Sequence, residues 1–191
     1  MSLDRLRDEI AACRVCEAAL GFEPRPVVQF SQTSRILIIG QAPGSKVHAS
    51  GIPWDDASGN RLCEWTGLTC DQLHDPALVA IVPMGFCYPG KASGGDKPPR
   101  PECAPLWHKR VLATLPEDRL TLLVGAYAQK AYLPATAGWT MARRVEHWRE
   151  FGSFIPLPHP AWRSTLFMRK HPWFEGELIP DLQRRVREAL G

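Results

Sequence analysis

The chain has 191 residues, a net charge of +3 and 45% hydrophobic residues, which suits one globular domain with a sizeable core. No apolar run approaches the length of a membrane span, and the N-terminal stretch MSLDRLRDEI is typical of a charged helix, not of a secretory signal. We therefore expect a cytoplasmic protein with no membrane partner, in which the six cysteines do not form structural disulfides.

Helices and strands are predicted to alternate along the chain. Helical spacing of apolar residues over 2–20 comes first. Four continuous apolar runs are typical of strands buried on both faces of a parallel sheet: 35–40, 79–83, 120–125 and 154–158. Helices are expected between and after them, at 60–68, 101–115, 126–133, 141–151 and 175–190. The pattern predicts a single α/β domain over residues 1–191, with a central four-stranded parallel sheet flanked by helices on both faces in an α/β/α sandwich.

Three polar loops follow predicted strands. They read GQAPG…GIPWDDASG over 40–59, PMGFCYPGKASGGDKPP over 83–99 and LPHPAWRS over 157–164. Open parallel sheets bind ligands beyond the carboxyl ends of their strands. These loops therefore define the candidate site.

The cysteines suggest a second site. Four of them have spacing that suits four thiolates around an iron–sulfur cluster or zinc: Cys13, Cys16, Cys87 and Cys103. A redox dithiol fits poorly, because the C-x-x-C pair lies in the first predicted helix and its exit and does not open a helix after a strand. The same four could also be small buried hydrophobic residues. Cys63 and Cys70 are interpreted as ordinary core or surface residues.

In their order along residues 10–165, these motifs resemble the uracil-DNA glycosylase superfamily, closest to the family 4 and family 5 branches that carry a [4Fe-4S] cluster. The first motif is GQAPG at 40–44 with GIPW at 51–54 and DDASG at 55–59. The cluster motif is the C-x-x-C pair followed by CYPGKASGGDKPPRPEC at 87–103. The last is LPHPA, which contains His159.

The resemblance implies roles for these residues. The catalytic group would be Asp56 or Asp55, which handles water and the sugar cation, together with His159 and Gln41. The other residues would contact the extruded base or the DNA: Gly40, Ala42, Pro43, Gly44, Trp54, Pro160, Trp162 and Arg163. The four cysteines would hold a [4Fe-4S] cluster, with zinc as the less favoured occupant.

Some of these residues also have ordinary structural interpretations. Trp54 could cap the core, and Asp55 or Asp56 could cap the helix that follows. The remaining histidines match no motif and are expected at the surface: His48, His74, His108, His147 and His171.

Several residues depart from the family pattern. Gln41 stands where family 4 has Glu, which removes a water-activating carboxylate. Pro83 stands where many members have an Asn that reads the base, and proline offers neither a backbone donor nor an amide. Ala161 replaces the Ser of the family's H-P-S motif.

The expected function is removal of uracil or another deaminated base from DNA, as in base excision repair, by a monomer. Two alternatives stay open. The first is a non-catalytic nucleic-acid-binding member of the same fold. The second is a zinc-bound hydrolase acting on a free nucleoside or nucleotide.

Overall fold

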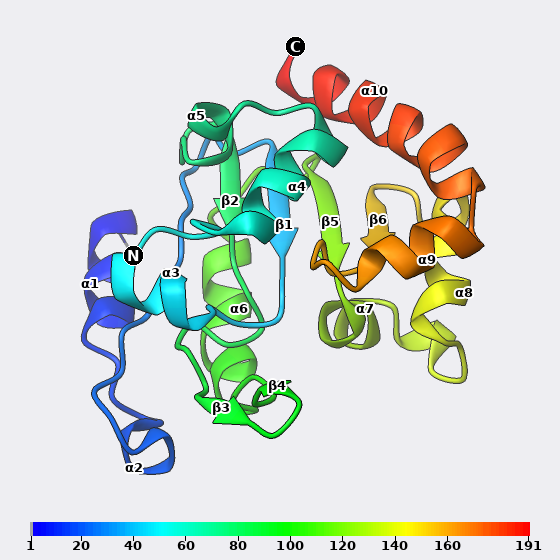
Figure 1. The fold of residues 1–191 in the computed structure, drawn as a ribbon. Coiled ribbons are helices and arrows are strands. Elements are labelled where there is room, and N and C mark those ends of the chain that lie inside the picture. Colours follow the sequence, from blue (N-terminus) through cyan, green and yellow to red (C-terminus); the bar gives the residue numbers. More distant parts are fainter. Residues whose placement is uncertain (1) are drawn as a thin grey trace.

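The computed structural model describes residues 2–191 (Figure 1). Four strands form its central sheet: β1 (Ile36–Ile39), β2 (Val79–Ile81), β5 (Leu120–Val124) and β6 (Phe154–Leu157). They are all parallel and lie in the order β2-β1-β5-β6. The predicted four-stranded parallel sheet is therefore confirmed.

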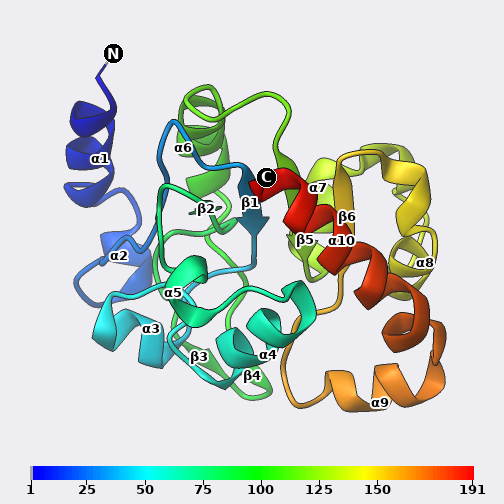
Figure 2. The ribbon, with the colours of Figure 1, turned by 90° about the horizontal axis from the view of Figure 1, so that it is seen from above.

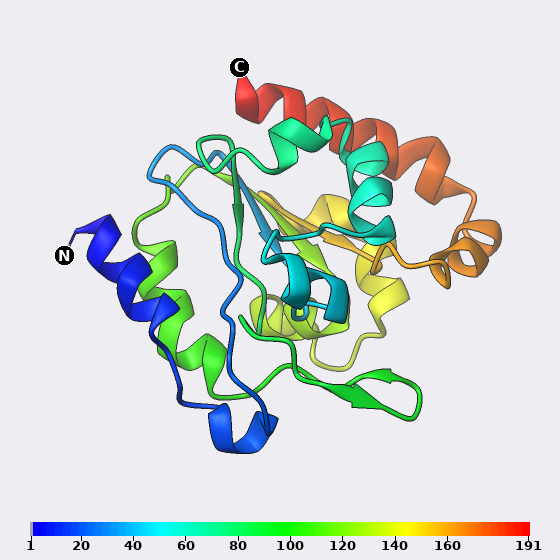
Figure 3. The same ribbon diagram turned by 60° about the vertical axis from the view of Figure 1, so that its left-hand side comes forward.

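Helices cover both faces of this sheet, because side chains alternate between the faces along each strand. On one face Ile36 and Ile38 pack in a core with α4 (Ala57–Thr66) and α10 (Ile179–Leu190). On the other face Leu37 and Ile39 pack with α1 (Leu3–Ala11), α6 (Cys103–Leu112) and α7 (Ala126–Tyr132). Figure 3 shows the sheet between these two layers, and Figure 2 shows α4 and α9 (Ser164–Lys170) on the same side of it.

Several helix boundaries differ from those predicted. The first helix ends at Ala11, and the Arg14 guanidinium donates to the carbonyl groups of Ala11 and Cys13 near that end. The chain resumes as α2 (Glu17–Leu20), so the C-x-x-C pair lies between two helices. The segment 141–151 divides into α8 (Met141–Glu146) and a 3₁₀ turn, Trp148–Phe151. The last helix begins at Ile179 after a π-helical turn, with Pro180 in its first turn, where a missing N–H costs nothing.

The sequence patterns did not predict five short elements. These are α3 (Ser45–Ser50), α5 (Cys70–Leu73), a 3₁₀ turn at Pro134–Thr136, α9, and a two-stranded antiparallel hairpin formed by β3 (Lys91–Ala92) and β4 (Gly95–Asp96). The hairpin projects away from the helical layers, as the green strands of Figure 3 show. Among residues 2–191, no helix combines the length and the apolar character needed to cross a membrane.

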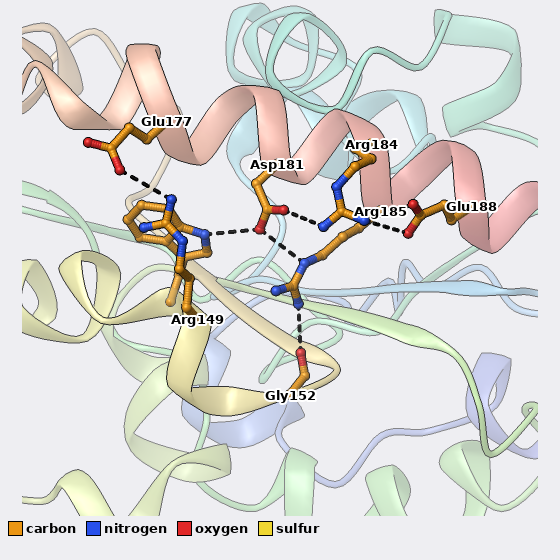
Figure 4. A network of polar contacts seen from close by, with 8 residues as sticks. Arg149, Gly152, Glu177, Asp181, Arg184, Arg185 and Glu188 are labelled. Carbon is orange, nitrogen blue, oxygen red and sulfur yellow. Dashed lines mark hydrogen bonds and ion pairs between the residues drawn. The ribbon is translucent and has the colours of Figure 1, made fainter.

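Helix α10 is fastened to the segment between α8 and β6 by a polar network (Figure 4). Asp181 accepts a hydrogen bond from the Trp148 indole at 3.1 Å and pairs with Arg184 and Arg185. Arg185 also donates to the Gly152 carbonyl at 2.7 Å. Arg184 is half exposed, and an exposed ion pair contributes only about 0–1 kcal/mol, whereas Asp181 and Arg185 are largely shielded from solvent. The network therefore mainly orients α10 over a core that hydrophobic packing stabilises.

Candidate active site

A pocket of about 570 Å³ lies beyond the carboxyl ends of the strands, within the usual size range of small-molecule sites. All three predicted loops contribute to its wall. The predicted site residues that line it are Gly40, Gln41, Ala42, Pro43, Gly44, Trp54, Asp56, His159 and Arg163. Asp55 is exposed beside the pocket, Pro160 is buried behind it, and Trp162 extends into solvent with 74% of its surface exposed. The fold thus brings Trp54 and Asp56 of the first loop together with His159 of the third loop around one pocket.

Trp54 and His159 lie next to each other in the wall of this pocket. Their ring centroids are 5.6 Å apart and their planes differ by 35°. Trp54 is the one non-glycine residue among residues 2–191 with a positive φ, at 59°, a conformation that costs an L-residue about 1–2 kcal/mol. Such strain is characteristic of functional sites, where the surrounding structure enforces it.

Two glycines leave room for Trp54 in this conformation. A Cβ on Gly59 would lie 1.8 Å from the Trp54 carbonyl oxygen, which no real atom could occupy. A Cβ on Gly40 would lie 3.1 Å from Cζ2 of the indole. Gly40 after β1 and Gly59 in the first turn of α4 therefore lack side chains because the Trp54 ring and backbone pass directly against them.

Of the two adjacent acids, only Asp56 reaches the pocket. It is also the N-cap of α4, where Oδ1 accepts hydrogen bonds from the backbone N–H groups of Ser58 at 2.8 Å and Gly59 at 3.0 Å. The helix-capping interpretation of this acid therefore holds, and the carboxylate lines the cavity as well.

The His159 loop is held by hydrogen bonds to its backbone. The Ser164 hydroxyl and the Ala161 N–H both donate to the His159 carbonyl, and Arg61 of α4 donates to the Ala161 carbonyl at 2.7 Å. Burial lowers the pKa of His159 below its ordinary value of about 6.5, although the nearby carboxylates of Asp56 and Asp96 act in the opposite direction. The imidazole is therefore neutral at pH 7 and has one N–H to donate.

His108 is buried, so the prediction that it lies at the surface was wrong. Its Nε2 lies 2.9 Å from the Pro83 carbonyl and its Nδ1 2.6 Å from the Tyr132 hydroxyl. Since a carbonyl only accepts, Nε2 carries the proton and Nδ1 accepts from the phenol. Burial lowers the pKa of His108, which favours this neutral form. The contact draws the Pro83 carbonyl to His108 and orders the end of β2 beside the pocket.

The sequence patterns did not single out Asp96, which also lines the pocket. It lies on β4 of the hairpin, so its position depends on a chain reversal at residues 93–94. The run Ser93-Gly94-Gly95 could have indicated this hairpin, because adjacent glycines favour tight hairpin turns.

The four cysteines of the predicted thiolate set come together. A second pocket, of about 20 Å³, is lined by Cys13, Cys16, Cys87 and Cys103. The Phe86 N–H donates to Cys103 Sγ at 3.2 Å, a contact that also suits a ligating sulfur. Burial raises the pKa of Cys87 to about 11 and that of Cys103 to about 12, so thiolates here need a cation to balance them.

The donor chemistry of this set fits a four-thiolate cofactor. Within residues 2–191, however, no three Cys, His, Asp or Glu side chains have the spacing for a metal ion. Cofactor binding would therefore require the thiols to adjust. The other two cysteines lie on α4 and α5, with Cys63 buried and Cys70 exposed.

A comparison with protein-family models identifies the fold family. The model described as the uracil DNA glycosylase superfamily matches residues 27–183, well over half of the chain. The match includes all three loops of the larger pocket and starts after the C-x-x-C pair. Members of this superfamily are generally glycosylases that act on DNA. The chain, with its parallel sheet and the pocket at the strand ends, belongs to the uracil-DNA glycosylase superfamily.

Proposed function

We propose that the protein is a DNA glycosylase that hydrolyses the N-glycosidic bond of uracil or another deaminated base. The observation that carries this proposal is the adjacent pair of Trp54 and His159 in the wall of a pocket of about 570 Å³. An extruded nucleobase needs an aromatic surface for stacking and a hydrogen-bond donor for its edge, and this pair supplies both.

The residues have complementary roles in bond cleavage. As the C1′–N bond breaks, negative charge develops on the departing base and positive charge on the sugar. The neutral His159 imidazole donates its N–H to the base, an interaction that strengthens as the charge develops. The Asp56 carboxylate balances the sugar cation. Trp54 stacks on the base, which contributes about 1–3 kcal/mol.

Basic side chains around the opening suit a DNA backbone. Lys91 and Lys97 are exposed on and beside the hairpin, and Arg163 lies at the pocket with its guanidinium 5.2 Å from the Trp162 ring. Contacts from such residues to phosphates position a duplex without reading its sequence. We therefore expect DNA binding that weakens as salt concentration rises.

We further propose that the four-cysteine set holds a [4Fe-4S] cluster in a structural role. Bound there, the cluster would link the segment after α1 to both ends of the loop that carries the hairpin. Anaerobic purification should yield brown protein with about four iron and four sulfide per chain, a ratio set by the cluster itself. A single zinc per chain would identify the less favoured occupant. Protein that contains neither iron nor zinc would refute the proposed metal site.

The activity is tested with labelled oligonucleotides that contain uracil, hypoxanthine or xanthine, single- and double-stranded, followed by alkaline cleavage of abasic sites. The wild type should cleave at least one substrate, and His159→Ala should lower its rate about 100-fold, as expected for loss of a transition-state hydrogen bond. His147→Ala is the matched control, because that ring packs on Trp139 outside the pocket. Folded wild-type protein with no cleavage of any substrate would refute the proposal and favour a non-catalytic binding role.

A further inference from the structure

The hairpin brings a second carboxylate to the pocket. Strands β3 and β4 pair in antiparallel register, with Lys91 opposite Asp96 and Ala92 opposite Gly95. The tip and the return strand line the cavity through Gly94, Gly95 and Asp96. Asp96 is the only one of these three residues with an ionisable side chain.

Asp96 lies against the first loop, close to Gln41. The Gln41 side-chain amide donates to the carbonyl of Lys97, the residue after Asp96, at 3.4 Å. A Cβ placed on Gly44 would lie 3.8 Å from Asp96 Oδ2, so the carboxylate sits over the loop backbone. Burial, with a smaller contribution from the nearby Asp96 carboxylate, raises the pKa of the Tyr88 phenol. Asp96 is also close enough to His159 to favour the protonated imidazole electrostatically.

The pocket needs a group that can accept a proton from water, and its other polar residues suit that task poorly. The Gln41 amide oxygen is a weak base, so this side chain can orient a water molecule but not deprotonate it. Asp56 is acidic, but its Oδ1 accepts the two N-cap hydrogen bonds of α4. Asp96, on an exposed hairpin, is therefore the carboxylate best placed to serve beside Gln41.

We propose that Asp96 is a catalytic residue that orients and deprotonates the attacking water. The inference rests on the glycosylase function proposed above. A bond forms between the water oxygen and C1′ while the C1′–N bond breaks, and its electron pair leaves with the base. The proton from water passes to the Asp96 carboxylate and then to the base anion, so the sugar gains a hydroxyl group and the base leaves neutral.

The test is the single-turnover rate of base release from the best substrate, measured for the wild type, Asp96→Asn and Asp118→Asn. General-base catalysis contributes about 10²–10⁴-fold, so Asp96→Asn should lower the rate at least about 100-fold. Asp118 is the matched control, since it is an exposed acid paired with Arg35 next to the start of β5, outside the pocket. Asp118→Asn should stay within about twofold of the wild type, the range expected for a surface substitution.

Chemical rescue separates a catalytic role from a structural one. Formate, a small carboxylate, should restore part of the activity of Asp96→Ala and should leave the wild type unchanged. Circular dichroism and thermal unfolding verify that both Asp96 variants fold, as an exposed hairpin position predicts. If the wild type is active and Asp96→Asn is unimpaired, the Asp96 inference is overturned while the glycosylase proposal stands. A folded Asp96→Ala variant that formate does not rescue would overturn the same inference. Inactive wild type would overturn the glycosylase proposal together with it.

Discussion

Replacing Trp54 by alanine and by glycine separates its ring from its backbone. Both variants lose the indole, and with it the stacking surface and the packing against the core above the sheet. Only glycine also relieves the positive φ of 59°. The matched pair therefore measures backbone strain by the difference between two variants that lose the same side-chain contacts.

The expected magnitudes follow from these two contributions. An alanine in the left-handed conformation is destabilised by about 1–2 kcal/mol, and a glycine avoids this strain. Glycine also has more conformational freedom in the unfolded chain, which cancels about 0.5–1 kcal/mol of that advantage. Trp54→Gly should thus be about 0.5–1 kcal/mol more stable than Trp54→Ala. For a chain of this length that raises the melting temperature by about 1–4 °C. Both variants should lose about 5–150-fold in kcat/KM, which corresponds to 1–3 kcal/mol of base stacking.

Thermal unfolding and single-turnover base release measure the two effects, with Trp54→Phe as the variant that keeps an aromatic ring. An alanine variant at least as stable as the glycine variant would show that the backbone at residue 54 is not strained. An alanine variant with the activity of Trp54→Phe would show that the ring does not hold the base.

The remaining predictions concern other residues around the pocket. Asp56→Ala should lower the free energy of unfolding by about 1 kcal/mol in chemical denaturation, whereas Asp56→Asn, an equally good N-cap, should lower it much less; equal losses would contradict the capping role. The His159 ring should titrate by NMR with a midpoint below its ordinary value of about 6.5, because burial lowers its pKa. Between that midpoint and pH 6.5 the unfolded chain binds more protons than the folded one, so the free energy of unfolding should fall as pH falls through this window. His159→Gln should reduce this dependence of stability on pH, and a midpoint above 6.5 would contradict the prediction. Tyr132→Phe leaves Nδ1 of buried His108 without its 2.6 Å partner, and the melting curve should show a loss of about 1–3 kcal/mol; an unchanged curve would mean that the hydrogen bond contributes nothing.

Local patterns determined much of this protein in advance. The four apolar runs became the four parallel strands, because a strand buried on both faces must be apolar along its whole length. The three loops that follow strands in the sequence line one pocket, because parallel strands bring their carboxyl ends to one edge of the sheet. The glycines at 40 and 59, on either side of Trp54, were visible in the sequence, although Gly59 lies in the first turn of α4 and not in the predicted loop.

Only the tertiary structure decided which polar residues share that pocket. Asp55 and Asp56 are adjacent in sequence, and the start of α4 turns one toward the cavity and leaves the other in solvent. The hydrophobic pattern of α6 does not predict that His108 is buried. It is buried because the Tyr132 hydroxyl and the Pro83 carbonyl lie against its two ring nitrogens. Asp96 reaches the pocket only because the hairpin of β3 and β4 reverses the chain at residues 93–94 and brings β4 beside the first loop. Periodicity records which face of an element is apolar, but contacts between distant polar groups depend on how the elements pack in three dimensions, and no local pattern carries that information.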